Sequence, residues 1–131
     1  MSVRLRLITP TRTLVEAEVE QVTAPGVAGE FGVLPQHVAF VGALDDGILA
    51  YVENGKRHHI LVCGGYAEVF GKIMTVLADD AELPEEVDAE ATKAELSRVQ
   101  RELTSTASEP RQVDTLLREQ RRLEYRLVLA R

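Results

Sequence analysis

Residues 47–63 read Gly47-Ile48-Leu49-Ala50-Tyr51-Val52-Glu53-Asn54-Gly55-Lys56-Arg57-His58-His59-Ile60-Leu61-Val62-Cys63. Two runs rich in apolar and β-branched residues, 47–53 and 57–63, flank the pair Asn54-Gly55. This pair favours a type I′ turn, because such a turn needs a positive φ at both central positions. The segment therefore predicts a β-hairpin whose two strands are neighbours in a sheet.

The same kind of pattern continues on both sides of this hairpin. Towards the N-terminus, residues 3–7 and 15–20 alternate apolar with charged residues, so each segment places its apolar side chains on one face. Further strands are expected at about 38–44, 66–70 and 72–78, with turn-forming residues between them. Many short strands at close spacing favour an all-β sandwich or barrel.

The chain changes character near residue 80 and then predicts two helices. Leu96, Val99 and Leu103 recur at helical spacing, and Asp88 stands where it can cap the first helix. A second apolar stripe follows a short break and consists of Val113, Leu116, Leu117, Leu123, Leu127 and Ala130. The short connection makes the two helices an antiparallel hairpin. We therefore expect two domains, residues 1–84 and residues 85–131.

The second predicted helix carries a basic face. Arg118, Arg122 and Arg126 recur every four residues, and Arg111 and Arg121 lie close to the same face. This face is either a solvated surface or a contact for an acidic partner. A two-helix hairpin alone buries one narrow seam, so its stability must come mainly from packing on something else. We expect the hairpin to be the conditionally docked part of the chain.

Composition excludes several classes of protein. The 131 residues carry a net charge of −6, which argues against a free-standing nucleic-acid binder, because phosphate affinity comes mainly from Lys and Arg. Hydrophobic residues make up 45% of the chain, enough for a packed core. A single cysteine, Cys63, leaves no intrachain disulfide. The sequence has no apolar run of about 18 residues, so we expect no direct membrane insertion.

The most informative segment is residues 25–37, Pro25-Gly26-Val27-Ala28-Gly29-Glu30-Phe31-Gly32-Val33-Leu34-Pro35-Gln36-His37. Its glycines and prolines predict a constrained loop rather than the interior of a strand. Gly29 and Gly32 bracket Glu30 and Phe31, so a carboxylate and an aromatic ring are presented together. The plainer interpretation is a tight β-turn with one buried phenylalanine.

This segment resembles a loop of the epsilon subunit of F-type ATP synthases, Pro-Gly-x-x-Gly-Glu-x-Gly-[Val/Ile]-Leu-Pro-x-His. Three further blocks agree with that family in order and spacing. They are Leu5-x-x-x-Thr9-Pro10 with Leu14, Leu44-x-x-Gly47, and a late hairpin, Gly64-Gly65-x-x-Glu68-Val69 with Val76-Leu77-Ala78-Asp79-x-Ala81. The resemblance covers residues 3–88 by motif and the remainder by architecture.

The resemblance implies a fold, a role and a set of contacts. The implied fold is α+β, a β-sandwich of about ten strands followed by a helical hairpin. The implied role is that of a non-catalytic subunit of the central stalk, bound to the gamma subunit and to the ring of c-subunits. The foot of the sandwich is expected to contact the c-ring and gamma, and the Gly64-Gly65 hairpin to lie along gamma. The expected contact residues are Glu30, Phe31, Gly32, Val33, Leu34, Pro35, His37, Gly64 and Gly65.

In this family the hairpin either folds on the sandwich or extends into the catalytic alpha/beta hexamer and blocks ATP hydrolysis. The candidate regulatory residues here are Arg111, Arg118, Arg121, Arg122 and Arg126. Some members bind ATP through Ile/Leu-Asp-x-x-Arg-Ala, whereas this chain reads Val87-Asp88-Ala89-Glu90-Ala91-Thr92. The positive charge that would meet a phosphate is missing, so we expect weak or absent ATP binding, no cofactor, and Asp88 as a helix cap.

Two alternatives come from other classes. A small β-barrel metalloenzyme would need His37 together with His58 or His59, but neighbours in a strand point to opposite faces, and we expect no metal site. A free-standing adaptor would bind an acidic partner through the hairpin. Cys63 follows an apolar run and is expected in the core rather than as a nucleophile. The expected location is peripheral, on the cytoplasmic face of a bacterial inner membrane, with the stromal face of a plastid thylakoid as the second possibility.

Overall fold

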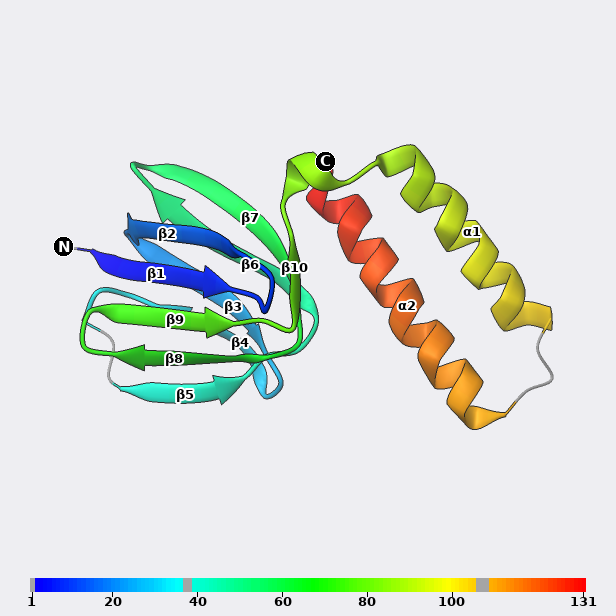
Figure 1. Ribbon diagram of the computed structural model, residues 1–131, viewed down its shortest axis with the longest axis horizontal. Helices are drawn as coiled ribbons and strands as arrows, with labels where there is room; N and C mark the ends of the chain where they lie inside the picture. The colour runs from blue at the N-terminus through cyan, green and yellow to red at the C-terminus, as the bar shows by residue number, and fades with distance from the viewer. Residues whose placement is uncertain (1, 37–38, 106–108) are drawn as a thin grey trace. The chain divides into compact units, whose positions relative to one another are not determined.

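The computed structural model describes residues 2–36, 39–105 and 109–131 (Figure 1). Within these residues it contains ten strands, a short 3₁₀ helix and two α-helices. The chain divides into two compact units, Met1–Leu83 with all the strands and Pro84–Arg131 with all the helices. The predicted architecture, a ten-stranded β-sandwich followed by two helices, is confirmed.

Two five-stranded sheets form the first unit. The first sheet has the order β2-β1-β9-β8-β5 and the second the order β10-β7-β6-β3-β4. Neighbouring strands are antiparallel, except that β1 and β9 run parallel. The strands are β1 (Val3–Ile8), β2 (Thr13–Val19), β3 (Gln21–Gly26), β4 (Gly29–Val33), β5 (Phe40–Ala43), β6 (Gly47–Glu53), β7 (Lys56–Cys63), β8 (Tyr66–Phe70), β9 (Ile73–Leu77) and β10 (Asp80–Glu82).

Alternation along the strands builds the core between the two sheets. Val3, Leu5 and Leu7 of β1 are buried, whereas Arg4 and Arg6 face outwards and form ion pairs with glutamates of β2. The same alternation repeats in the neighbouring strands. The other fully buried aliphatic side chains of the sandwich core include Val19, Val22, Val33, Leu49, Ile60, Val62, Met74 and Val76.

The turn between β6 and β7 has the predicted geometry. Asn54 and Gly55 adopt φ angles of 54° and 75°, and the register pairs Glu53 with Lys56. The N–H of Gly55 donates to the carboxylate of Glu20 at 2.9 Å, which ties this turn to the corner between β2 and β3. Positive φ at both central positions confirms the prediction made from the pair Asn54-Gly55.

Three strands were missed by the sequence patterns, namely β3, β4 and β10. Residues 25–33 were expected as a loop, but most of them belong to the antiparallel pair of β3 and β4, which is joined by a turn from Gly26 to Gly29. β4 is an edge strand, so its glycines weaken only one ladder. Pro25 is tolerated because β3 pairs with β6 only as far as Thr23.

The second unit begins with the 3₁₀ helix η1 (Pro84–Glu86) and continues with α1 (Ala89–Ser105) and α2 (Pro110–Leu129). α1 and α2 pack through an apolar seam, whose buried residues are Val99, Leu116 and Leu123, with Leu96 and Leu103 half-buried beside them. Pro110 occupies the first turn of α2, where its missing N–H costs no helical hydrogen bond. In the described part of the chain, no helix combines the length and the hydropathy needed to cross a membrane.

Candidate functional site

The turn between β3 and β4 is the first candidate surface. Two backbone hydrogen bonds hold it against the end of β5 and the residues just after it. The N–H of Val27 donates to the carbonyl of Ala43 at 3.0 Å, and the N–H of Asp45 donates to the carbonyl of Pro25 at 2.9 Å. A Cβ atom on Gly26 would stand 2.6 Å from the carbonyl oxygen of Gly29, so this position needs glycine. The turn is therefore fixed in place by contacts with the other sheet.

A groove of about 480 Å³ lies beside this turn. Val27 and Val41 line it and are 66% and 69% exposed. Phe31 and Phe40 also line it, with ring centroids 5.0 Å apart and planes tilted by 59°. Glu30 adds an exposed carboxylate to the lining. An apolar groove with one carboxylate suits a partner that offers an apolar side chain next to a basic group.

The expected contact residues of this segment do not all share one surface. Glu30 and Phe31 line the groove, whereas Gly32, Leu34 and Pro35 are absent from the residues that line it. Val33 is fully buried in the sandwich core, so its assignment as a partner contact is wrong for this structure. Phe31 and Val33 lie two residues apart on β4 and so face the same side, with Val33 in the core and Phe31 half-buried against it. His37 lies outside the described residues.

Gly64 and Gly65 have structural roles within the sandwich itself. They connect β7 in one sheet with β8 in the other, and they directly precede the antiparallel hairpin of β8 and β9, which is the late hairpin expected from the sequence. Their φ angles are +67° and +98°. A Cβ atom on Gly65 would overlap the backbone of Leu77, and one on Gly64 would stand 2.6 Å from the Asp79 carboxylate. The two glycines therefore allow the β7–β8 connection to lie close to the end of β9 and the segment that follows it.

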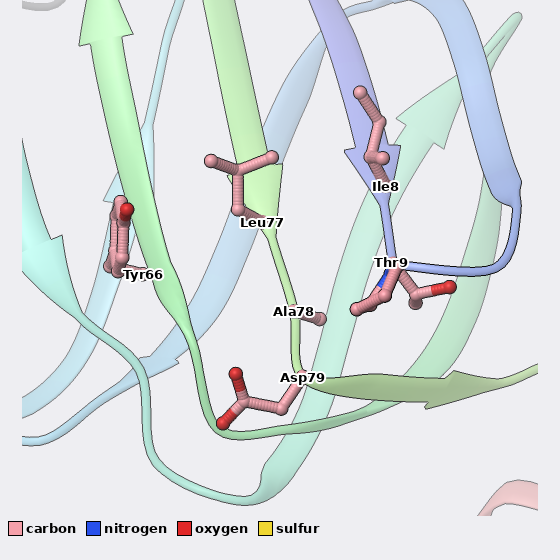
Figure 2. Close-up of a pocket in the computed structure, with 7 residues that line it drawn as sticks. Ile8, Thr9, Tyr66, Leu77, Ala78 and Asp79 are labelled. Carbon is pink, nitrogen blue, oxygen red and sulfur yellow. The ribbon is translucent and has the colours of Figure 1, made fainter.

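A second hollow, of about 340 Å³, lies next to this crossing (Figure 2). Tyr66, Leu77 and Ile8 stand side by side on β8, β9 and β1, because Leu77 is in register with both of the others. Tyr66 is 53% exposed. The remaining lining residues are Thr9, Pro10, Ala78 and Asp79. The sequence interpretation did not identify this surface, although Thr9, Pro10, Leu77, Ala78 and Asp79 all belong to the sequence blocks quoted above.

The arginines of α2 differ in exposure. Arg111, Arg118 and Arg121 are exposed, whereas Arg122 and Arg126 are half-buried. At 3.6 residues per turn, Arg118 lies about 200° around the helix from Leu116 of the seam. The three exposed guanidinium groups therefore stand away from the contact with α1. They are the exposed members of the predicted basic face.

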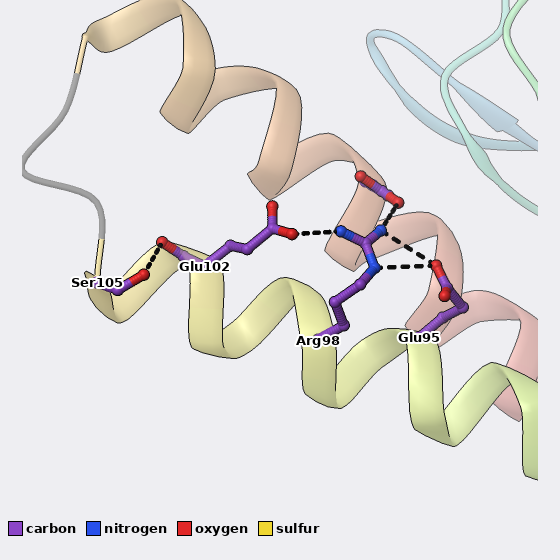
Figure 3. Close-up of polar contacts among 5 residues, drawn as sticks. Glu95, Arg98, Glu102 and Ser105 are labelled. Atoms are coloured by element: carbon purple, nitrogen blue, oxygen red, sulfur yellow. Dashed lines mark hydrogen bonds and ion pairs between the residues drawn. The ribbon is translucent and has the colours of Figure 1, made fainter.

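Arg98 on α1 is a polar centre that the sequence interpretation missed (Figure 3). It bonds three carboxylates: Glu102 at 2.6 Å and Glu95 at 3.1 Å on its own helix, and Glu119 of α2 at 2.9 Å. The hydrogen bonds that Arg98 donates to Glu95 and then to Glu102 raise the pKa of Arg98 above its usual range. The spacings of Glu95 and Glu102 could have predicted two of these pairs, since residues three or four apart meet on a helix.

The start of α1 is closed by Asp88. Its side chain accepts a hydrogen bond from the N–H of Ala91 at 3.1 Å, and its carbonyl accepts one from the hydroxyl of Thr92 at 2.7 Å. Thr92 is buried, and the nearby Lys93 forms an ion pair with Glu90 at 3.4 Å. Asp88 thus acts as a helix cap at the position where an ATP-binding motif was considered.

His58, His59 and Cys63 are the described residues that were candidates for metal binding or catalysis, and all three lie in β7. His58 stacks on Tyr51, with ring centroids 5.0 Å apart, whereas His59 is exposed. Cys63 is buried at the end of β7. Among the residues for which the structure gives positions, no three His, Cys, Asp or Glu side chains are grouped so that they could hold a metal ion.

Comparison with known proteins shows the family to which this chain is similar. The family model for the β-sandwich domain of ATP synthase delta/epsilon chains matches residues 2–84. The ATP synthase epsilon chain of Nitratidesulfovibrio vulgaris (strain DP4) is 43% identical over 102 residues, which cover 78% of this chain and 76% of that protein. The epsilon chain of Citrifermentans bemidjiense is 42% identical over 106 residues, covering 81% and 77%.

Solved structures agree with these sequence matches. A chain in the cryo-EM structure of OSCP, F1 and the c-ring of the Euglena gracilis mitochondrial ATP synthase aligns with a TM-score of 0.78 and 27% identity, covering 94% of this chain and 79% of that one. A chain of the Tetrahymena thermophila central stalk and c-ring aligns with a TM-score of 0.65 over the whole of this chain and 98% of that one, and at 12% identity it shares the fold. The chain therefore belongs to the delta/epsilon family of ATP synthases and, within it, to the epsilon chains.

Proposed function

We propose that this subunit is a non-catalytic part of the central stalk, which couples the catalytic head to the c-ring and restrains ATP hydrolysis through its helical hairpin. Its membership of the epsilon chains and its likeness to a chain of a solved F1/c-ring assembly support the stalk role. The observation that carries the regulatory part is the position of Arg111, Arg118 and Arg121, which are exposed on α2.

The sandwich supplies the attachment to the rotor in this proposal. The groove beside the β3–β4 turn takes an apolar side chain of a c-ring loop, and Glu30 meets a basic group next to it. The hollow at Tyr66 and Leu77 lies against gamma. Attached in this way, the subunit is peripheral and sits at the cytoplasmic face of a bacterial inner membrane. The exposed apolar residues on both surfaces support these contacts, because such residues gain most from being covered.

The hairpin supplies the regulation. When α2 leaves the α1 seam and extends, its arginines meet acidic segments of the alpha/beta hexamer and hold the rotor. The full set of candidate residues is Arg111, Arg118, Arg121, Arg122 and Arg126. Opening exposes a seam of three buried and two half-buried apolar residues, and a single buried aliphatic side chain is worth about 1.5–3 kcal/mol, so contacts with the hexamer have to replace this burial.

ATP itself plays no part in holding the folded hairpin. Ala91 offers no charge to a phosphate, Asp88 is occupied as a helix cap, and Lys93 is paired with Glu90. We therefore expect neither an ATP site nor another cofactor on this chain. Thermal unfolding of the purified subunit with and without millimolar ATP tests this point, and a clear rise in Tm with ATP would overturn it.

The decisive experiment compares the full chain with a chain that ends at Leu83, where the first compact unit ends. Each is assembled with gamma, the c-ring and the catalytic hexamer, and ATP hydrolysis is measured. We expect the shortened chain to co-purify with gamma and the c-ring, and hydrolysis to rise. Assembly with unchanged hydrolysis would refute the inhibitory role, and loss of binding to gamma by the full chain would refute the stalk role.

A further inference from the structure

Arg98 offers its donors to more carboxylates than it can neutralise. Its Nε and Nη2 both bond the same oxygen of Glu95, at 3.3 and 3.1 Å, and Nη1 bonds Glu102 at 2.6 Å. Nη2 also bonds Glu119 of α2, at 2.9 Å. A guanidinium has five N–H donors, and the four contacts described here draw on most of them. One positive charge thus stands among three negative charges, two on α1 and one on α2.

The two groups of carboxylates act differently when the helices separate. Glu95 and Glu102 are three and four residues from Arg98 on the same helix, so they stay beside it whether the hairpin is closed or open. Glu119 reaches Arg98 only while α2 lies against α1. In the closed hairpin, Glu119 gains one ion pair with Arg98. It also lies near Glu95 and Glu102, which bond the same guanidinium and repel its negative charge.

We propose that Arg98 poises the hairpin close to balance, with Glu119 favouring the closed form and Glu95 and Glu102 favouring the open form. This inference rests on the proposed opening of the hairpin and names the side chains that set its equilibrium. In the open form Arg98 keeps two of its three carboxylate partners, so its ionic contacts change little when α2 leaves. The side chains of Arg98 and Glu119 are each 40% exposed, and ion pairs at such sites contribute little. We call the ion pair between Arg98 and Glu119 the latch. It is weak enough for a competing partner to break it.

The proposal predicts opposite effects from two neutralisations. Glu119→Gln removes the contact between the helices, so the ratio of open to closed hairpin should rise about two- to fivefold. The pair Glu95→Gln with Glu102→Gln leaves Arg98 free for Glu119 and removes the repulsion, so the same ratio should fall. Lys93→Met is the matched control, because it removes the ion pair to Glu90, which lies within α1; the ratio should stay unchanged.

The experiment uses the full chain in the assembled enzyme. Spin labels are attached at the exposed positions Ala94 on α1 and Gln112 on α2, in a background with Cys63→Ala, and the distribution of distances between them is measured. Two distances in the unmutated chain, shifted in opposite directions by the two sets of variants, support the proposal. Two distances with no shift for Glu119→Gln, or shifts in the same direction, overturn the latch alone. A single distance under all nucleotide conditions overturns the proposed opening and the latch together.

Discussion

Gly65 packs directly against the backbone of Leu77, at the corner where the chain crosses from one sheet to the other. A Cβ atom on Gly65 would overlap the Leu77 carbonyl and stand 2.8 Å from the Cα atom of Ala78. Backbone cannot move aside as a flexible side chain can, and the φ of +98° adds strain for any other residue. The contact joins the end of β7 to the end of β9, next to the hollow lined by Tyr66.

Replacement of Gly65 by alanine should therefore destabilise the sandwich strongly. We expect Gly65→Ala to lower the free energy of unfolding by about 3–5 kcal/mol, from the overlap and the left-handed backbone combined. The control is Gly71→Ala, at a φ of +63°, where no described atom lies within 4 Å of the added Cβ. It should cost about 1–2 kcal/mol. Denaturant unfolding of the full chain measures both, and equal losses would contradict the close contact.

The helical seam should fail locally when Val99 is shortened. Val99 is fully buried between α1 and α2, and Val99→Ala should cost the hairpin about 1.5–3 kcal/mol. Hydrogen exchange should speed up along both helices and stay unchanged in β1 and β9. Leu117→Ala, at an exposed position of α2, serves as the control and should leave exchange in the seam as it was. Faster exchange in the sandwich would show that the two units unfold together.

Removal of the cap at Asp88 should loosen the first turn of α1. Asp88→Ala deletes the hydrogen bond to the N–H of Ala91 and should cost about 1 kcal/mol. Asp88→Asn keeps an oxygen acceptor and should retain most of that stability. Exchange rates of the amides at 90–92 provide the measurement. Equal rates in the alanine and asparagine variants would argue that the side chain does not cap the helix.

The exposed apolar groove can be tested without disturbing the core. Val27→Ser should leave Tm nearly unchanged, because Val27 is 66% exposed, but it should weaken binding to the c-ring about tenfold if this residue fills a ring contact. Phe70→Ser removes an apolar side chain that is 72% exposed and does not line the groove. Pull-down of the assembled ring with each variant compares the two. If both variants bind the ring equally well, the groove beside the β3–β4 turn is not the contact with the c-ring.

The Glu18 carboxylate should titrate below its usual range. A hydrogen bond from the hydroxyl of Ser2, at 2.6 Å, is the main cause that lowers the pKa of Glu18, with help from Arg4. A lowered native pKa stabilises the fold above the unfolded-state pKa, and that contribution disappears as the pH falls through the native pKa. Ser2→Ala should raise the pKa of Glu18 in an NMR titration of its side chain. An unchanged titration would rule out this hydrogen bond as the cause.

Local patterns predicted the parts of the fold that depend on neighbours along the chain. β1 and the β6–β7 turn were predictable because each depends only on its own residues. The alternation from Val3 to Leu7 indicates a strand, and the pair Asn54-Gly55 indicates the turn. β4 was not, because its glycines are acceptable only at the edge of a sheet, and its place in the sheet is a property of the whole fold. The ion pair of Arg98 with Glu119 depends on the register of two helices, which no local pattern contains.

The parallel pairing of β1 with β9 also constrains when the sandwich can form during synthesis. Leu5 is in register with Met74, so the first strand must wait for almost the whole sandwich sequence before one of its two partners exists. Contacts of such wide separation along the chain slow folding, and they leave an unpaired strand edge exposed in the meantime. A nascent chain on the ribosome can complete its first sheet only after β9 has left the exit tunnel. Chaperone binding to β1 should therefore end at that length of chain, before the helices have left the tunnel.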